Sequence, residues 1–350
     1  MVVIDGAQGE GGGQVLRSAL TLSVLTGKPF YLQNVRSRRP KPGLMPQHLK
    51  AVDAAAAICA ANVEGATPGS TSLVFEPGRI RSGRYRFDIG TAGSSSLVLQ
   101  TIFFPLSFAN AASDVSITGG THVPWSPCFN FLELNWLKIL ESMGFRAQLK
   151  LDTAGFYPHG GGRIQATIRP CQELSPALFV YRGRLLRIIG ISAVANLNRN
   201  IAERQKRQAI QRLLHVTPTI RIKIEQLHAR SKGTFILLLA EFERSQCCYT
   251  ALGALGKPAE QVADEAVDAL LSFLATDGAI DQYLADQMLL PFCLAEGQSE
   301  FKTCKVTQHL ITNANIIRAF LPSEIHISGA LGDLGYVRIL NNEAAQFRVK

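Results

Sequence analysis

Hydrophobic and polar positions follow one another along the chain in blocks that repeat a common order. Residues 2–4 are apolar, a glycine-rich stretch follows, and residues 14–25 carry apolar side chains at helical spacing. A strand-like segment at 85–89, a turn of small residues and a largely apolar helix at 97–108 repeat this order. The pattern predicts a weak internal repeat of about 80 residues and a pseudo-symmetric α/β body with helices on one face of mixed sheets.

The remaining periodic segments complete three passes of this order, the third near the end of the chain. The predicted helices of the three passes span residues 14–25, 47–61, 97–108, 129–143, 286–295 and 313–320. The predicted strands span residues 2–4, 71–75, 85–89, 115–118, 146–151, 164–168, 301–306 and 324–327.

A segment of different character lies between the second and third passes. It contains a basic helix, an alternating strand, an apolar strand and a long amphipathic helix, at residues 201–214, 220–224, 235–240 and 260–274. We expect an inserted domain over residues 183–275. The core domain would then combine residues 1–182 with residues 276–350.

Composition narrows the class of protein. Of 350 residues, 47% are hydrophobic and 18% are charged, which excludes disorder as the overall state. No run reaches the roughly 18 apolar residues of a membrane helix, and the first residues lack a basic leader, so we expect a cytoplasmic protein without a membrane partner. The seven cysteines are scattered without a Cys-x-x-Cys pair, which favours reduced thiols.

The net charge of +9 is concentrated in two basic blocks. No acid occurs between Glu10 and Asp53, where seven lysines and arginines lie, and residues 199–232 hold nine bases against two acids. Two such blocks favour a polyanionic partner, because each neutralised phosphate releases counterions. A solubilising surface is the alternative interpretation.

The glycine-rich stretch at residues 5–14 has the character of a phosphate-binding turn at a helix start. It matches neither the Rossmann nor the Walker pattern, and a tight strand-to-helix connection is the alternative. Glu10 is the sole acid of its basic surroundings, so its carboxylate is a candidate ligand for a divalent cation that bridges phosphates. A second glycine run at 160–162 is either a hairpin tip or the wall of an active site.

Seven ordered segments together resemble the RNA 3′-terminal phosphate cyclase family, over nearly the whole chain. They are Asp5–Arg17, Arg36–Leu49, Gly93–Gln100, Gly119–Thr121, Gly155–Gly162, Tyr283–Gln287 and His309–Asn313. The resemblance implies three βαβαββ repeats like the C-terminal domain of a bacterial translation initiation factor, with a smaller inserted α/β domain.

The resemblance also implies a three-step reaction. His309 would attack the α-phosphorus of ATP and become adenylylated, AMP would pass to an RNA 3′-phosphate, and the neighbouring 2′-hydroxyl would close a 2′,3′-cyclic phosphate. Imidazole suits this role because it is largely neutral and nucleophilic near pH 7. Without its place in the motif, a lone histidine would more often be a core or surface residue.

The other site residues are carried over from the family motifs. Glu10 would bind Mg²⁺ or Mn²⁺ and the phosphates of ATP. The residues expected around the phosphates of ATP and of the RNA end are Arg17, Arg36, Arg39 and Gln47. Those expected to hold the adenosine are Gln100, Tyr283, Leu284, Ala285, Asp286 and Gln287; Tyr283 could stack on the purine.

Two positions depart from the family pattern, and two other classes compete with it. Ala154 stands where a basic residue is usual, and Val123 where a polar one is frequent, which puts rate and substrate preference in doubt. One competitor is a non-catalytic pre-ribosomal RNA-binding relative, which lacks the nucleophilic histidine. The other is an enolpyruvyl transferase-like enzyme, which normally has six repeats. The physiological RNA and the oligomeric state stay open.

Overall fold

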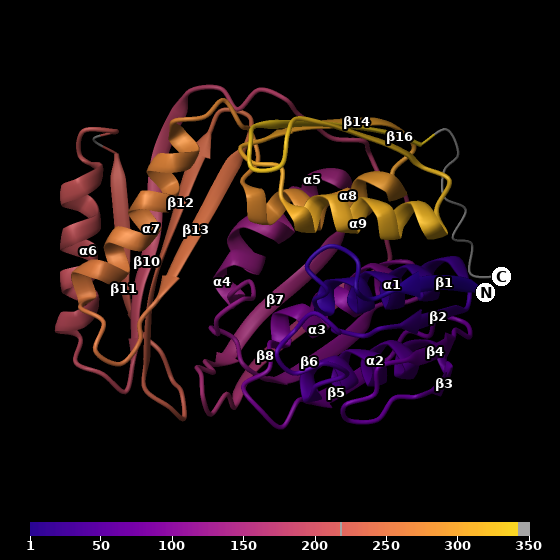
Figure 1. Ribbon diagram of the computed structural model, residues 1–350. Helices are drawn as coiled ribbons and strands as arrows, with labels where there is room; N and C mark the ends of the chain where they lie inside the picture. Colours follow the sequence, from indigo (N-terminus) through magenta and orange to yellow (C-terminus); the bar gives the residue numbers. More distant parts are fainter. Residues whose placement is uncertain (218, 342–350) are drawn as a thin grey trace.

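The computed structural model describes residues 1–217 and 219–341, and within them the strands form four four-stranded sheets (Figure 1). The first group of elements comprises β1 (Val2–Asp5), α1 (Gly13–Thr26), β2 (Phe30–Gln33), α2 (Pro46–Cys59), β3 (Asn62–Glu64) and β4 (Leu73–Glu76). Their sheet has the order β1-β2-β4-β3, with β1 and β2 parallel and the other pairs antiparallel.

The second group has the same order of elements. It comprises β5 (Arg84–Asp88), α3 (Ser95–Ser107), β6 (Ser113–Gly119), the continuous helical run α4 (Phe129–Phe131), η1 (Leu132–Trp136) and α5 (Leu137–Met143), β7 (Arg146–Thr153) and β8 (Gly162–Arg169). The sheet order is β5-β6-β8-β7, and again the first pair is parallel.

The third group is interrupted after its first strand. It comprises β9 (Leu178–Phe179), α8 (Gln282–Leu294), β14 (Gly297–Thr303), α9 (Gln308–Phe320), β15 (Glu324–Ser328) and β16 (Gly335–Asn341). Its sheet has the order β9-β14-β16-β15, with β9 parallel to β14. Figure 1 shows α8 and α9 beneath this sheet, with α9 beside α1 of the first group.

The fourth sheet is formed by the segment between β9 and α8. Its elements are β10 (Leu185–Ala195), α6 (Asn200–Leu213), β11 (Ile220–Gln226), β12 (Gly233–Phe242), β13 (Gln246–Leu252) and α7 (Ala259–Leu274), and the sheet order is β11-β10-β12-β13. Both helices lie on the side of this sheet away from the other three (Figure 1). Residues of these six elements bury a hydrophobic cluster of their own.

The predicted elements are present, with some displaced bounds. The helices predicted at 286–295 and 313–320 begin four to five residues earlier, at Gln282 and Gln308, because Asp281 and Thr307 cap their first backbone N–H groups. The strand predicted at 301–306 is β14, four residues earlier. The third group begins at β9, ahead of the inserted segment, because a strand of two residues has no detectable periodicity. Strands β2, β3, β10, β13 and β16 were also not predicted.

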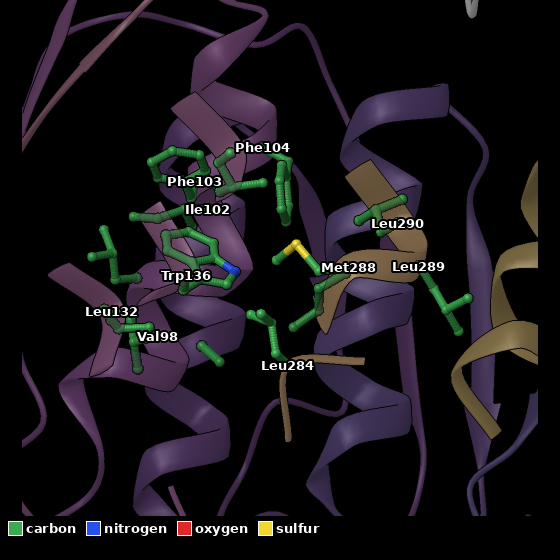
Figure 2. Close-up of a cluster of buried hydrophobic side chains, with 14 of the residues drawn as sticks. Val98, Ile102, Phe103, Phe104, Leu132, Trp136, Leu284, Met288, Leu289 and Leu290 are labelled. Carbon is green, nitrogen blue, oxygen red and sulfur yellow. The ribbon is translucent and has the colours of Figure 1, made fainter. Parts of the chain in front are cut away.

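The largest hydrophobic cluster joins the helices of the three groups. Figure 2 shows side chains of α3 and η1 meeting Leu284 and Met288 of α8. Trp136 is fully buried at their centre, and its ring lies 4.7 Å from that of Phe103, edge to face. The core thus fixes α3 and α8 relative to each other. Within the described residues no helix has the length and apolar character needed to cross a membrane.

Candidate functional site

His309 lies in the first turn of α9, where it faces the glycine-rich loop and the start of α1. Its Nδ1 is 2.5 Å from Oε1 of Gln14, and its Nε2 is 3.1 Å from Oε2 of Glu10. The imidazole is therefore held on one side by an amide and faces a half-exposed carboxylate on the other.

Gln14 determines which nitrogen of His309 carries the hydrogen. Its Nε2 donates to Oδ2 of Asp286 at 2.9 Å and to the carbonyl oxygen of His309 at 3.3 Å. When Asp286 is ionised its carboxylate can only accept, so the amide turns its NH₂ towards Asp286 and its oxygen towards His309. Nδ1 must then donate to that oxygen, so in the neutral ring Nε2 carries the lone pair and faces Oε2 of Glu10 at 3.1 Å.

Burial and nearby charges set the protonation of this cluster. Burial lowers the pKa of His309 below its usual 6.5, Glu10 opposes this shift, and the positive charges of Arg17 and Arg39 add to it. Burial also raises the pKa of Asp286 to about 7, against the effect of Arg17. Burial lowers the pKa of Arg17 to about 10, so Arg17 stays charged at neutral pH. His309 is thus predominantly neutral near pH 7.

The glycine-rich loop reaches the cluster because two of its residues have left-handed backbone. Gly9 has φ +57°, and a Cβ built on it would lie 2.1 Å from Oγ1 of Thr312 on α9. Gly11 has φ +58°. Only glycine adopts this conformation without strain, and only glycine allows this approach. The loop therefore packs on α9 and presents Glu10 next to His309.

The arginines expected at phosphates lie in different environments. Nη2 of Arg39 is 3.3 Å from Oε2 of Glu10 on the open side of the site. Arg36 donates instead to the carbonyl oxygens of Lys41 and Gly43, at 2.6 and 3.0 Å, and braces its own loop. Arg17 lies beneath Gly13, where a built Cβ would be 2.9 Å from Nη1. Arg17 and Arg39 thus adjoin the histidine, whereas Nη1 of Arg36 is engaged by its own loop.

Three of the residues expected at the adenosine, Gln100, Tyr283 and Gln287, lie in one region. Nε2 of Gln100 on α3 donates to Oε1 of Gln287 on α8 at 2.6 Å. Tyr283, in the first turn of α8, is 55% exposed and meets Tyr249 of β13 edge to face at 6.1 Å. Gln100, Gln287 and the exposed Tyr283 can therefore line one site.

The other expected residues lie in different surroundings. The side chains of Leu284 and Ala285 are fully buried in the core, so only their backbone could contact a ligand. Asp286 contacts Gln14 beside the histidine. Gln47 accepts a hydrogen bond from the backbone N–H of Ser94 at 2.9 Å, which links α2 to the loop before α3.

Two polar residues of the site were quoted in motifs but not assigned a role from the sequence. One is Gln14; the other is Asn313, whose Nδ2 donates to the carbonyl oxygen of Asp286 and whose Oδ1 accepts from Ser18. Each lies four positions from a predicted site residue, Glu10 and His309 respectively, and that spacing was the available signal.

Glu10 is the predicted metal ligand, and its surroundings define what it could bind. Among the described residues no group of three or more His, Cys, Asp or Glu side chains could hold a metal ion. A half-exposed carboxylate between His309 and Arg39 supplies one hard oxygen donor, so most ligands of a bound Mg²⁺ would come from phosphates and water.

Both departures from the family pattern are buried. Ala154 is 1% exposed, and its N–H donates to the carbonyl oxygen of His228 at 2.8 Å, where β7 ends against the inserted segment. Val123 packs on Gly120. Small apolar side chains suit both positions, and neither touches the cluster around His309.

Comparison with known proteins gives one family match over most of the chain. Residues 8–327 match the family model described as RNA 3′-terminal phosphate cyclase. The chain is 45% identical over 342 residues to the protein of that name from Ralstonia nicotianae, covering 97% of both chains. It is 39% identical over 340 residues to that from Pyrococcus furiosus, covering 97% of this chain and 99% of the relative. Among solved structures, the enolpyruvyl transferase NikO from Streptomyces tendae has a TM-score of 0.39 at 8% identity, over 96% of this chain and 48% of that one, which is too weak to carry an argument.

Proposed function

Because the chain belongs to the RNA 3′-terminal phosphate cyclase family, we propose that it uses ATP to convert an RNA 3′-terminal phosphate to a 2′,3′-cyclic phosphate. The observation that carries the proposal is the state of His309. Its Nδ1–H is held by Gln14 at 2.5 Å, and burial favours the neutral ring, so Nε2 carries the lone pair, on the half-exposed side of the ring that faces Glu10.

In the first step, Nε2 of His309 attacks the α-phosphorus of ATP. A P–N bond forms, the bond from that phosphorus to the bridging oxygen breaks, and pyrophosphate leaves. Nδ1 keeps its hydrogen on Gln14, so the adenylylated ring carries a positive charge, which Asp286 beyond Gln14 stabilises. A cationic imidazole is a good leaving group, and the adduct is primed for transfer.

The second and third steps act on the RNA end. An oxygen of the RNA 3′-phosphate attacks the phosphorus of the adduct, the P–N bond breaks, and neutral His309 is restored. The 2′-hydroxyl then attacks the 3′-phosphorus and loses its proton, and AMP leaves as the five-membered ring closes. Arg17 and Arg39 adjoin His309 and would neutralise the phosphates in these steps, with Gln47 and Arg36 at the margin.

ATP would be held at both ends. Glu10 would bind Mg²⁺ or Mn²⁺, which screens the charge of the phosphates when bound. Tyr283 would stack on the adenine, and the paired amides of Gln100 and Gln287 would contact its edge. The segment from Leu284 to Asp286 would support this site from beneath, since two of its side chains are buried and the third faces Gln14.

We also propose a division of the chain. The three groups with matching strand order would be pseudo-symmetric βαβαββ repeats, similar to the C-terminal domain of a bacterial translation initiation factor, within a core of residues 1–182 and 276–350. Residues 183–275 would form the inserted domain, supported by their separate hydrophobic cluster. Residues 218 and 342–350 of this division lie outside the described part of the chain.

Labelled ATP tests the chemistry directly. We expect protein incubated with [α-³²P]ATP and Mg²⁺ or Mn²⁺ to carry an acid-labile, hydroxylamine-sensitive AMP adduct. His309→Ala should abolish the adduct. His326→Ala is the matched control, because His326 also faces a glutamate, Glu324, but on exposed β15. An unlabelled wild type that remains folded would reject the cyclase and favour a non-catalytic RNA-binding relative.

A further inference from the structure

We propose that Trp125, Tyr157 and Arg230 form a platform that binds single-stranded RNA upstream of its 3′-terminal phosphate. The three residues are called the RNA platform below. The proposal rests on the proposed function for the identity of the RNA end, and it adds residues that contact the nucleotides preceding that end.

Trp125 is held in solvent by a rigid loop. Its side chain is 100% exposed and its backbone has φ +62°, a left-handed conformation that costs a bulky residue energy. The loop around it is fixed, since the backbone N–H of Phe129 donates to the carbonyl oxygen of Thr121 at 3.0 Å and Oγ of Ser126 donates to that of Val123 at 3.1 Å. A strained, tethered and fully exposed indole has no role in the core and is available to a ligand.

Tyr157 projects from the same buried junction as Trp125. His122, three residues before Trp125, stacks on Phe156 at 5.3 Å and on Phe235 of β12 at 4.4 Å. Tyr157 follows Phe156 directly and is 70% exposed. The exposed side chains of Trp125 and Tyr157 are therefore both anchored close in sequence to this buried ring stack, at the contact between the second group and the inserted segment.

Arg230 supplies positive charge beside these rings. Gly161, four residues after Tyr157, has φ +72°, and a built Cβ would lie 2.9 Å from Cδ of Arg230. In the described part of the chain no carboxylate lies within ion-pair distance of Arg230, which is exposed. Its guanidinium is thus free to meet a phosphate.

Two close packings connect the RNA platform to Gln47, a residue proposed at the margin of the phosphate site. A Cβ on Gly160 would lie 2.7 Å from the carbonyl oxygen of Thr91, so the Tyr157 loop rests on the loop before α3. A Cβ on Gly93 of that same loop would lie 3.0 Å from Cβ of Gln47. A strand that passes Gln47, at the margin of the proposed phosphate site, can therefore extend over these glycines to the RNA platform.

The chemistry of these residues selects single-stranded nucleic acid. Bases stack on exposed aromatic rings without regard to sequence, and arginine neutralises the backbone between them. A duplex keeps its bases stacked on one another and offers them no such contact.

Intrinsic fluorescence tests the binding without the chemistry. The chain has two tryptophans, and the other, Trp136, is fully buried, so it serves as an internal reference. We expect a single-stranded octanucleotide with a 3′-phosphate to quench the exposed indole, and Trp125→Phe to remove the signal. No quenching by the octanucleotide would overturn the proposal. Quenching by ATP alone would also overturn it, because the indole would then belong to the nucleotide site.

Kinetics provide the second test. We expect Trp125→Ala or Tyr157→Ala to raise KM for cyclisation of the octanucleotide about 5- to 100-fold, and Arg230→Ala to lower the salt dependence of RNA binding by about one unit of log–log slope. Self-adenylylation, in which RNA takes no part, should keep the wild-type rate. Tyr181→Ala, also at an exposed tyrosine, is the matched control. An unchanged KM in Trp125→Ala and Tyr157→Ala, together with an unchanged salt slope in Arg230→Ala, would refute the RNA platform.

The failures of the two proposals are distinguishable. A wild type that is quenched by RNA but acquires no AMP would reject the cyclase and keep the RNA platform. A wild type that is adenylylated and cyclises RNA, with fluorescence and KM independent of the platform residues, would reject the RNA platform alone.

Discussion

Replacing Gln14 with alanine isolates the contribution of one amide to the reactivity of His309. The change removes the acceptor of Nδ1–H, 2.5 Å away, and the donor to Asp286, 2.9 Å away, but leaves the imidazole and Glu10 in place. The ring then loses the constraint on its orientation and on its tautomer. It also loses the link to the Asp286 carboxylate, which would stabilise the positive charge of the ring in the proposed adduct.

The size of the effect follows from the charge that develops on the ring. A hydrogen bond to a charged group contributes about 1.5–3 kcal/mol, and this one strengthens as the imidazole becomes cationic. We therefore expect Gln14→Ala to slow self-adenylylation about 10- to 150-fold. The assay is single-turnover formation of the AMP adduct from labelled ATP at saturating nucleotide, measured at pH 8 so that Asp286, whose pKa is about 7, is ionised.

The matched control is Gln8→Ala, at an exposed glutamine of the same loop. It should leave the rate unchanged, and both variants should keep the wild-type Tm. A folded Gln14→Ala protein whose rate stays within twofold of wild type would refute the reasoning about the tautomer of His309.

Three further predictions concern Asp286, Gly9 and Asp281. The pKa of His309 is lowered and that of Asp286 is about 7, so the fall of the adduct-formation rate towards acid pH should follow the protonation of Asp286. In a pH–rate profile, Asp286→Asn should move this fall to lower pH. A fall that stays at the same pH would contradict the expectation. Gly9→Ala should slow formation of the AMP adduct at least about tenfold, because its Cβ would meet Thr312. The control is Gly27→Ala, at φ +69° with no atom within 4 Å of a built Cβ. It should lower the free energy of unfolding, measured with denaturant, by only about 1 kcal/mol. Asp281→Ala should destabilise the fold by about 3 kcal/mol, since this buried carboxylate caps α8 and accepts from the N–H of Cys248. Burial raises the pKa of Asp281 from 3.8 to about 6, so the unfolding free energy of wild type, relative to that of Asp281→Asn, should fall as pH rises through this window. The same difference between the two proteins at pH 4 and at pH 7 would contradict this.

The sequence predicted long periodic elements well and short ones poorly. Helices such as α1 and α7 were identified because their apolar residues recur at helical spacing over three or more turns. Strands such as β3 and β9, with three and two residues, are too short to show alternation, and they exist because neighbouring strands pair with them. Because β9 was missed, the third group was predicted to begin after the inserted segment, whereas this segment interrupts the group.

The candidate site was predicted in part. Motif residues led to His309, Glu10 and Arg39, which the fold brings into contact over almost 300 positions of sequence. The tautomer-setting role of Gln14 depends on which way an amide faces, and that is decided by Asp286 on another helix. Likewise, the engagement of Arg36 by its own loop follows from a backbone conformation, φ +54°, that composition does not reveal.

The interruption between β9 and α8 has a consequence for the order of folding. The pairing of β9 with β14 joins Leu178 to Glu300 across 122 positions, whereas the first two groups complete their sheets within local stretches of chain. Such distant pairing closes late, because the loop entropy must be overcome before the contact forms. During synthesis the first two groups can assemble as they emerge, and the last sheet must wait for the intervening segment to be made. His309 therefore meets Glu10 and Gln14 only at the final stage, so an incomplete chain presents the glycine-rich loop without His309.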